Sequence, residues 1–362
     1  MTESLTTLVA AVHPIDQAAA DAARDRHARL AKPAGSLGRL EEVGAQLAAI
    51  AGACPPPPVD RPGLVIAAAD HGVHVQQVTP WPQQVTAAMV ETFRAGRATA
   101  NALAALVGAE VAVLDAGVVT PLADGEAAAG AAIPLVRAGI RAGTEDITAA
   151  DAMTLPECVA AVQAGAATAD SLLDRGIDLL IGGDMGIANT TAAAALIAAY
   201  TGASAEAVTG RGTGVDDPTY RRKQEVVAKA VARHRAQTTA PRAGLPSLAA
   251  LGGLEHAALT GVLLAGAARR VPVLLDGVNA VAAALAATAI CPPVAGYLIA
   301  GHRSAEPGAS AGLAQLGLSP LLELEMRLGE GTGALAAVGL VRAAATVLRE
   351  VATLDELGLA GG

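Results

Sequence analysis

The stretch DLLIGGDMGIANTTAAAA, residues 178–195, determines how the rest of the chain is interpreted. Its first part, Leu179 to Gly182, is an apolar run typical of a buried parallel strand. The glycines that follow allow a sharp turn, and the polar residues after them favour the start of an alanine-rich helix. These residues are Gly182, Gly183, Gly186, Asn189, Thr190 and Thr191. Because a helix N-terminus directs free N–H groups at one point, the stretch predicts an anion site.

The alternative interpretation is an ordinary strand–helix connection, which a glycine pattern alone would favour. This turn also contains a carboxylate, Asp184, and two threonine hydroxyls. These groups favour a phosphate-binding turn over a simple connection.

The length allows one large α/β unit with a smaller appendage, or two domains. The chain has 362 residues, of which 52% are hydrophobic, 16% charged and only 1% aromatic. The core must therefore consist of Ala, Val and Leu in closely packed helices and strands. The net charge of −9 argues against a nucleic-acid partner, because no basic stripe is present to neutralise phosphates.

The three cysteines, Cys54, Cys158 and Cys291, are far apart and show no metal-ligand spacing. This usage is typical of a reducing compartment rather than of a disulfide framework. Glu3 stands where a signal peptide would be basic. We therefore expect a cytoplasmic protein.

One segment, residues 278–300, is uncharged and long enough to cross a bilayer. Pro292-Pro293 interrupts it, and Asn279 is a polar residue within it. A buried helix followed by a buried strand over Val294–Ala300 explains the segment better, so we expect no membrane span.

The order of elements predicts a sheet domain preceded by helices. Residues 14–31 have helical spacing, and Ser36 is expected to cap a helix over Leu37–Ala51. Pro55–Pro58 predicts a stiff linker and a domain boundary. Beyond it, apolar strands alternate with alanine-rich helices, which predicts a doubly wound, mostly parallel α/β sheet.

Five predicted strands end in polar or glycine residues. They are LVIAAA before Asp70, VAVLD before Ala116, LLIG before Gly183, VPVLL before Asp276 and VAGYLIA before Gly301. Ligands of open α/β sheets bind just beyond the carboxyl ends of the strands. The five ends therefore predict one shared cleft.

Two polar loops between the strands leave alternatives open. Trp81, between two prolines in TPWPQQVT (79–86), could form the wall of a pocket for a flat ligand or pack beneath its own loop. Lys223 follows the glycine loop GRGTGVDD (210–217) and could reach an anion or be a solvated helix residue.

Three histidines, His71, His256 and His302, occupy separate segments without a zinc-type spacing. We therefore expect no metal site, and we interpret these residues as satisfied polar groups at strand ends.

The C-terminal part contains a glutamate between two glycines. Leucines in 321–328 predict a short amphipathic helix broken at Gly329, and Thr332 is expected to cap a helix that runs to about Arg349. Glu330 could merely complement the helix dipole. Its bare Gly-Glu-Gly backbone instead favours a carboxylate open to a ligand and able to act as a general base.

The motifs KPAGSLGRLEE, AADHGV, GDMGIANTT, GRGTGVDD, LGGLEH, LLDGVNA, HRSAEPGA and RLGEGTGA occur in one order over residues 32–337. In this the chain resembles the nicotinate-nucleotide–dimethylbenzimidazole phosphoribosyltransferase family of cobalamin synthesis. The resemblance implies a large Rossmann-like α/β domain over 59–337 and a small helical domain from both chain ends, 1–58 plus about 338–362. It also implies a homodimer with the partner chain near the active site.

The resemblance further implies roles for individual residues. The phosphate of nicotinate mononucleotide would lie near Gly183, Gly186, Asn189, Thr190, Gly212 and Lys223. The 5,6-dimethylbenzimidazole would lie by Pro82 and Gln83, and Glu330, between Gly329 and Gly331, would take its ring proton. The freed nitrogen would then attack C1′ of the ribose as nicotinate leaves.

Asp184 would stabilise the cationic sugar electrostatically. No cofactor and no divalent ion are expected. The chain departs from the family at two positions, since Asp184 and Gln84 stand where the family commonly has Glu. The shorter Asp184 predicts an indirect or water-bridged contact with the sugar, and both changes affect the choice of base more than the reaction.

Two other functions fit the same fold, because a fold does not determine its chemistry. One is a different transferase or hydrolase of nucleotide phosphates. The other is a non-catalytic nucleotide-binding regulator, which would bind nicotinate mononucleotide without releasing nicotinate.

Overall fold

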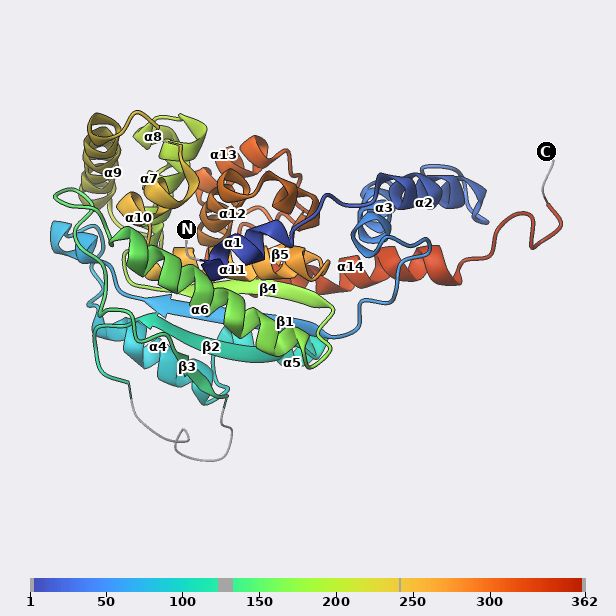
Figure 1. The fold of residues 1–362 in the computed structure, drawn as a ribbon, viewed down its shortest axis with the longest axis horizontal. Coiled ribbons are helices and arrows are strands. Elements are labelled where there is room, and N and C mark those ends of the chain that lie inside the picture. Colours follow the sequence, from blue (N-terminus) through green and yellow to red (C-terminus); the bar gives the residue numbers. More distant parts are fainter. Residues whose placement is uncertain (1–2, 123–132, 241, 360–362) are drawn as a thin grey trace.

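The computed structural model describes residues 3–122, 133–240 and 242–359, and a parallel sheet forms its centre (Figure 1). The strand order is β3-β2-β1-β4-β5-β6, and every pairing is parallel. The six strands are β1 (Pro62–Ala69), β2 (Glu110–Gly117), β3 (Leu135–Arg137), β4 (Leu179–Met185), β5 (Val273–Leu275) and β6 (Leu298–Ala300). The winding direction reverses between β1 and β4, and the ends of strands at such a point form a ligand crevice.

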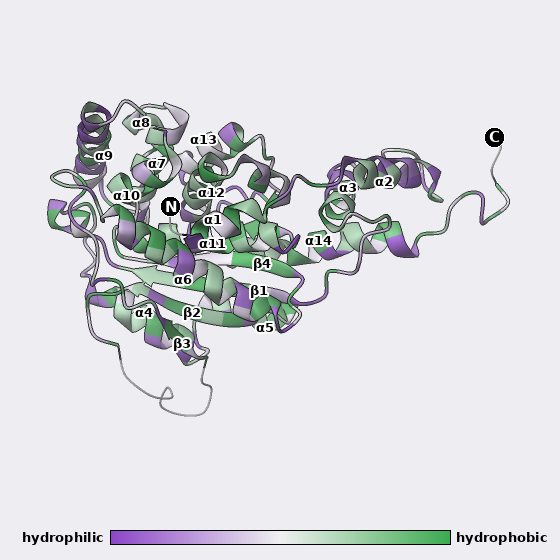
Figure 2. Ribbon diagram, viewed as in Figure 1, coloured by the Kyte–Doolittle hydropathy of each residue, from purple (hydrophilic) through white to green (hydrophobic). Residues whose placement is uncertain are grey.

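Strand β1 is buried on both faces, and its side chains alternate between two cores. Val65 and Ala67 belong to one hydrophobic cluster, and Leu64 and Ile66 belong to the other. A strand buried on both faces is continuously apolar because helices cover both sides of the sheet, as the hydropathy colours of Figure 2 show. The predicted doubly wound α/β class is therefore confirmed.

Helices α6 and α11 cover one face, and α4, α5 and α14 cover the other. Helix α11 contacts β1 and β4, and α6 contacts β2, whereas α4 contacts β1, α5 contacts β2 and α14 contacts β4. Their bounds are α4 (Gln84–Arg94), α5 (Thr99–Val107), α6 (Leu155–Leu173), α11 (Leu254–Ala268) and α14 (Thr332–Glu350).

A further group of helices packs around α12 (Val278–Ile290), above the sheet in Figure 1. Helices α7, α10 and α13 contact α12, and α9 contacts α7 and α8. Their bounds are α7 (Asn189–Thr201), α8 (Ala205–Val208), α9 (Asp217–Gln237), α10 (Gly244–Leu251) and α13 (Pro307–Leu316), with short 3-10 helices at Gly72–Gln76 and Pro292–Tyr297. Helix α12 is buried among these elements, as the sequence predicted.

Segments near both ends of the chain form a helical region that extends to the right of the sheet in Figure 1. Helices α2 (Gln17–Arg29) and α3 (Arg39–Ala51) pack on the distal part of α14. Helix α1 (Glu3–Ala10) instead packs on α11 and α6. A domain boundary at 338 would cut the continuous helix α14. A boundary at 58 would place α1 in the small domain with α2 and α3, although α1 packs on helices of the large domain. The division into domains remains a prediction.

Helix α14 is the one helix of the described ranges that is long and apolar enough to cross a membrane. Just over half of its most apolar window, 56%, is buried inside the protein. Its apolar side chains, among them Leu335, Val338 and Val341, belong to the core beneath the sheet. We therefore interpret α14 as a core helix.

Strand β4 is longer than the sequence predicted. Gly182 and Gly183 lie within it, paired with Val65 and Ile66 of β1, and the turn begins only at Gly186. Glycine is needed at 183 because a Cβ there would lie 2.7 Å from the carbonyl carbon of Glu330. The glycine thus serves a close backbone approach inside the strand rather than a turn.

The helix predicted over 321–328 does not form. Leu321 and Leu322 donate backbone hydrogen bonds to Ala300 and Gly301 at the end of β6, and the residues up to Gly329 form an irregular segment in which Glu325 has a left-handed backbone. These long-range bonds and the packing of the leucines override the helical spacing.

Two predicted helix caps are also wrong. Ser36 lies in a turn, and Gly38 caps α3, while Gly331 rather than Thr332 is the cap of α14. Position 331 has a left-handed backbone, with a φ of 82°, that glycine adopts most easily. Thr332 is the first helical residue, and its hydroxyl donates back to the carbonyl of Gly329.

Two errors concern the strands. Residues 294–297 belong to a 3-10 helix, so β6 contains only the last three residues of the predicted strand. Strand β3 at the sheet edge was missed because it has three residues, two of them exposed, and no buried apolar run.

The close packing of α6 against α11 predicts a stability effect. A Cβ on Gly165 of α6 would lie 1.8 Å from the carbonyl oxygen of Ala258 on α11. We expect Gly165→Ala to lower the free energy of unfolding by about 2–3 kcal/mol, measured by urea denaturation, because the helices must separate. Gly339→Ala is the control, since a Cβ at this exposed position of α14 meets nothing within 4 Å. It should raise stability by up to about 1 kcal/mol, and equal effects of the two substitutions would contradict the explanation.

Candidate active site

A cavity lies at the carboxyl ends of β4, β5 and β6, next to the loop that follows β1. Its walls include residues 184–191 after β4, residues 277–279 after β5 and three side chains after β6. Two further segments, 211–215 and 327–329, close it from the side. Its position agrees with the crevice expected at the reversal of strand order.

Only part of the predicted cleft forms. The end of β2 faces a separate surface hollow, and Asp70 after β1 is fully buried. The Asp70 carboxylate accepts hydrogen bonds from the Thr86 hydroxyl at 2.6 Å and from the Val119 amide at 2.9 Å. Asp70 therefore joins loops rather than facing a ligand. Of the aspartates at strand ends, Asp70, Asp184 and Asp276, Asp184 is the one on the cavity wall.

One end of the cavity is suited to an anion. The turn before α7 has no side-chain cap, and Gly186 allows it to approach β1, since a Cβ there would lie 2.4 Å from the carbonyl oxygen of Ala69. Asn189 and Thr190 in the first turn of α7 lie on the wall. The N-terminal end of this helix provides a positive dipole.

Lys223 faces this end of the cavity. Its side chain is 2% exposed on α9, and its ammonium group donates to the hydroxyl of Thr190 at 2.7 Å. Burial lowers the pKa of Lys223 to about 8, and the negative charge of Glu306 opposes the shift. Lys223 is therefore not the solvated helix residue of the alternative interpretation.

The glycine loop is held by two charged side chains. The amide of Gly212 donates to a Glu306 carboxylate oxygen at 2.7 Å, and Arg327 donates to the Gly212 carbonyl at 2.9 Å. Arg211 and Arg327 both lie on the cavity wall with Lys223. Three cations and a helix N-terminus therefore surround one end of a cavity in an acidic protein.

Asp184 lies beyond the anion end, at the end of β4. Its Oδ2 accepts hydrogen bonds from the amides of Asn189 at 2.9 Å and Asn279 at 2.6 Å, and Oδ1 has no partner among the described residues. Burial raises the pKa of Asp184 to about 7, and the nearby charge of Asp276 adds to the shift. A group poised in this way changes charge when a cation comes close.

A carboxylate after β5 holds the turn that contains Glu330. Asp276 accepts hydrogen bonds from the amides of Gly331, Gly333 and Ala334 at 3.1, 2.8 and 3.1 Å. The Asp276 carboxylate therefore supplies the side-chain cap of α14 that Gly331 at the N-cap position lacks and that was expected from Thr332. The ring of His302 lies 3.3 Å from Asp276 and completes this contact.

Glu330 adopts a left-handed backbone with a φ of 62°, between Gly329 and Gly331 at 83° and 82°. Such a conformation is strained for a residue with a Cβ and is found mainly where function requires it. The turn packs against Asp184, because a Cβ on Gly329 would lie 3.2 Å from its Oδ2.

The side chain of Glu330 is buried, with 5% exposure, and it is not on the cavity wall. The expectation of an open carboxylate is therefore wrong for this structure. Burial raises the pKa of Glu330, and the charge of Asp276 adds to the rise, while the backbone amide of Ala100 opposes it. Its Oε2 atom has no hydrogen-bond partner in the part of the chain that is described.

The residues expected beside the base are also off the wall. Pro82 is exposed, and Gln83 donates to the carbonyl of His71 at 3.0 Å. Trp81, 48% exposed, lies on the cavity wall and favours the first of its two interpretations. Gly183 and Gly331 pack behind the wall, in contact with each other.

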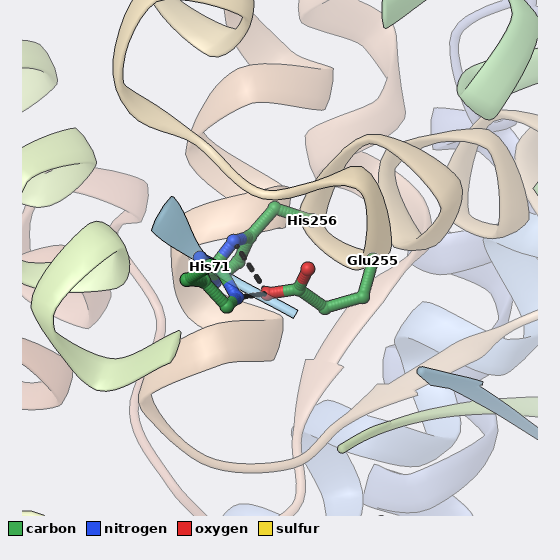
Figure 3. Close-up of side chains that lie close together, drawn as sticks. All are labelled: His71, Glu255 and His256. Carbon is green, nitrogen blue, oxygen red and sulfur yellow. Dashed lines mark hydrogen bonds and ion pairs between the residues drawn. The ribbon is translucent and has the colours of Figure 1, made fainter. Parts of the chain in front are cut away.

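A buried histidine cluster lies behind the site (Figure 3). Glu255 Oε1 lies 2.8 Å from His71 Nε2 and 3.0 Å from His256 Nδ1. The three donor atoms lie within 4.8 Å of one another, a spacing that could hold a metal ion. The two short contacts have the length of hydrogen bonds, which fits satisfied polar groups at His71 and His256, although His256 is on α11 rather than at a strand end. His302 Nδ1 and Glu255 Oε2, by contrast, are buried without a hydrogen-bond partner among the described residues.

Four residues of the site were not identified from the sequence: Asn279, Glu306, Arg327 and His256. Asn279 and Glu306 lie in the glycine-containing segments GVNA and HRSAEPGA, which directly follow β5 and β6. Their position after strands was a usable signal. Arg327 was concealed by the wrongly predicted helix, and nothing local distinguishes His256 from a core histidine.

The chain is similar to known proteins over almost its whole length. A phosphoribosyltransferase family model matches residues 12–359. The nicotinate-nucleotide–dimethylbenzimidazole phosphoribosyltransferase of Salinispora tropica is 53% identical, covering 98% of this chain and 99% of the relative. The protein of that name from Chloroflexus aggregans is 46% identical and covers 98% of both chains. A crystal structure of the Thermus thermophilus protein of that name has a TM-score of 0.88 at 42% identity, covering 96% of this chain and 100% of that one.

The raised pKa of Asp184 predicts a dependence of stability on pH. Its folded-state value of about 7 lies above the unfolded value of about 4. The neutral carboxyl therefore stabilises the fold below about pH 4, and this contribution is lost as the pH rises through about 7. We expect the stability of Asp184→Asn relative to the native chain to rise by about 2–3 kcal/mol between pH 5 and pH 8, measured by urea denaturation. Asp25→Asn, at an exposed position of α2, should show a much smaller change; equal changes in both variants would contradict the assignment.

Proposed function

This chain belongs to the nicotinate-nucleotide–dimethylbenzimidazole phosphoribosyltransferase family, and we propose on that basis that it transfers the phosphoribosyl group of nicotinate mononucleotide to 5,6-dimethylbenzimidazole. The products are nicotinate and α-ribazole 5′-phosphate, which supplies the nucleotide loop of cobalamin. The observation that carries the proposal is the order of groups at one cavity. Cations lie at one end, Asp184 lies beyond them, and the turn that contains Glu330 packs against Asp184.

The phosphate of nicotinate mononucleotide binds at the N-terminus of α7. Gly186, Asn189 and Thr190 provide the turn and the helix start, and Lys223 and the loop at Gly212 lie opposite. A bound phosphate dianion would favour the charged form of Lys223, whose pKa burial has lowered. The phosphate thus fixes the position of the ribose relative to Asp184.

Asp184 faces the anomeric carbon of the ribose. When the bond to nicotinate breaks, its electron pair passes to the pyridinium nitrogen, and positive charge develops on the sugar. A carboxylate in a buried site stabilises that charge strongly. The cation also favours the ionised form of Asp184, so the pKa near 7 of the free protein falls as charge develops.

Glu330 acts as the general base. It accepts the N–H proton of the benzimidazole. The nitrogen that forms the new bond to C1′, with inversion from β to α, is the other ring nitrogen, which already carries a free lone pair, rather than the deprotonated one expected from the resemblance. A raised pKa suits this task, because a base of higher pKa accepts a proton more readily at neutral pH. Since its side chain is buried, the Gly329–Gly331 turn must move for Glu330 to reach the base.

A homodimer would complete the mouth of the cavity. Trp81 and Leu328 lie on the wall and are 48% and 54% exposed, and Val75 nearby in the chain is also exposed. Exposed apolar side chains around a ligand site are typical of surfaces that another chain covers. We place the reaction in the cytoplasm, which the three free cysteines support.

The proposal is tested with the purified chain, nicotinate mononucleotide and 5,6-dimethylbenzimidazole, with products followed by chromatography. Nicotinate and α-ribazole 5′-phosphate should form in equal amounts. Nicotinate release without added base would identify a hydrolase or a different transferase. Binding of nicotinate mononucleotide without any release of nicotinate would identify a regulator.

Removing the general base should stop the transfer but not the binding. We expect Glu330→Gln to lower kcat by about 10²–10⁴-fold, because the amide cannot accept the proton. The Kd for nicotinate mononucleotide, measured by calorimetry, should stay within about threefold. Glu323→Gln, seven residues earlier and exposed beside Arg303, should leave kcat unchanged. An unchanged kcat in Glu330→Gln would remove Glu330 from this role.

A further inference from the structure

The two oxygens of Asp184 are not equivalent. The amide groups of Asn189 and Asn279 both donate to Oδ2, at 2.9 and 2.6 Å, and Oδ1 has no hydrogen-bond partner within the described ranges. Asp184 is on the cavity wall, but Oδ1 itself is buried, with the turn at Gly329 packed against the carboxylate. Oδ1 is therefore the oxygen left for a ligand once that turn moves. Whatever fixes the two amides also fixes which oxygen is available.

The orientation of Asn279 depends on His256. An asparagine amide can present either its NH₂ group or its oxygen to a neighbour, and the two ends have nearly the same shape. His256 Nε2 lies 3.1 Å from Asn279 Oδ1. If Nε2 carries a proton, the oxygen of Asn279 must face His256 and its NH₂ must face Asp184.

With Asp184 ionised, the surroundings of His256 require a proton on Nε2. Its Nδ1 atom lies 3.0 Å from the amide of Gly253 and 3.0 Å from Glu255 Oε1. If Nδ1 accepts from Gly253, the ring is neutral and its proton is on Nε2. The other case is that Nδ1 donates to Glu255. If Nε2 then had no proton, Asn279 would have to donate its NH₂ to Nε2 and turn its oxygen toward the Asp184 carboxylate, where two acceptors would meet. Only the doubly protonated ring avoids this.

Glu255 and His71 hold His256 in place. Glu255 and His256 are fully buried, and Glu255 Oε1 lies between the rings of His71 and His256, which meet edge to face at 5.9 Å (Figure 3). Burial would raise the pKa of Glu255, but the two histidines outweigh it and hold the pKa well below its usual range. The attraction of Glu255 also raises the pKa of His256 against the effect of burial.

We propose that His256 is a positioning residue for the transfer: its Nε2–H group fixes the amide of Asn279, which keeps Oδ1 of Asp184 directed at the ribose. The inference rests on the proposed function, and it deepens it by assigning a role to a residue that lies off the cavity wall. The hydrogen bonds from His256 reach Asp184 through Asn279, and the charge of His256 also acts on Asp184 directly.

The network also controls the charge of Asp184. The charged and titratable groups around Asp184 are Asp276 after β5, Glu255 and His256 on α11 and Glu330 in the turn packed against it, with Lys223, Arg211, His302, Glu306 and Arg327 on other walls of the cavity. His256 and the Asn279 amide both lower the pKa of Asp184, against the larger effect of burial. Loss of the Nε2–H group should therefore favour the protonated form of Asp184.

Two substitutions at 256 separate the two ring nitrogens. In His256→Gln, the side-chain amide can reach the position of Nε2 and donate to Asn279. In His256→Asn, the shorter amide reaches the position of Nδ1 and still contacts Glu255 but not Asn279. Asn279→Ala breaks the same link while leaving the histidine intact, and it keeps the test decisive if His256→Asn does not fold.

We expect His256→Asn to lower kcat by about 10–100-fold, the effect of a lost hydrogen bond to a charged group. The KM for nicotinate mononucleotide should stay within about threefold, and the acidic limb of kcat/KM should move up by about one pH unit. His256→Gln should retain most of the kcat. In the Asn279→Ala background, His256→Asn should add less than about twofold, because the two act as one unit. His27→Asn, at a buried histidine away from the site, should leave kcat and the pH profile unchanged.

Titration of the Asp184 carboxyl by carbon-detected NMR, assigned with Asp184→Asn, needs no turnover. It separates failure of the network from failure of the proposed function: an upward shift of the Asp184 pKa in His256→Asn supports the network even in a chain without transferase activity. Equal losses in His256→Asn and His256→Gln, additive effects with Asn279→Ala, or an unmoved Asp184 titration would overturn the proposal. Stoichiometric zinc in the purified protein would also overturn it, by assigning the cluster to a metal.

Discussion

The structure depends on one buried carboxylate at the end of β5. Asp276 accepts three amide N–H groups from the first turn of α14, and His302 contacts it as well. Helix N-termini attract carboxylates, and in a buried place such bonds are strong. This contact connects the sheet to the helix that carries the distal α2 and α3, and it fixes the turn at Glu330 against β4.

That contact makes the conformation of Glu330 possible. Three successive left-handed residues, Gly329, Glu330 and Gly331, are costly, and the non-glycine residue alone costs about 1–2 kcal/mol. The three hydrogen bonds to Asp276 and the close packing on Gly183 offset this cost. The charge of Asp276 also raises the pKa values of both Asp184 and Glu330, so one structural carboxylate tunes the two groups that the proposed reaction uses.

The sequence predicted what local patterns determine. Five strands, the α/β class, the start of α7 and the helix over α14 follow from apolar runs and helix signals, and the structure confirms them. The sequence alone could not predict the irregular segment at 321–328, because backbone hydrogen bonds to Ala300 and Gly301 determine its conformation. Likewise, Asp184 and Lys223 stand in visible glycine motifs, but Asn279 and His256 matter only through partners 95 and 23 residues away in sequence.

Under the proposed function, the arrangement of charges around the cavity favours one direction of substrate binding. Arg211, Lys223 and Arg327 surround the anion end, while Asp184, backed by Asp276, lies beyond it. Nicotinate mononucleotide has a phosphate at one end and, at the other, a pyridinium ring that bears a carboxylate. With the phosphate at the cations, the pyridinium nitrogen beside the anomeric carbon lies toward Asp184. The reverse orientation would bury a phosphate against two carboxylates at several kcal/mol. Because the acids attract positive charge most strongly when it moves onto the sugar, the same asymmetry that orients the substrate also lowers the barrier to its reaction.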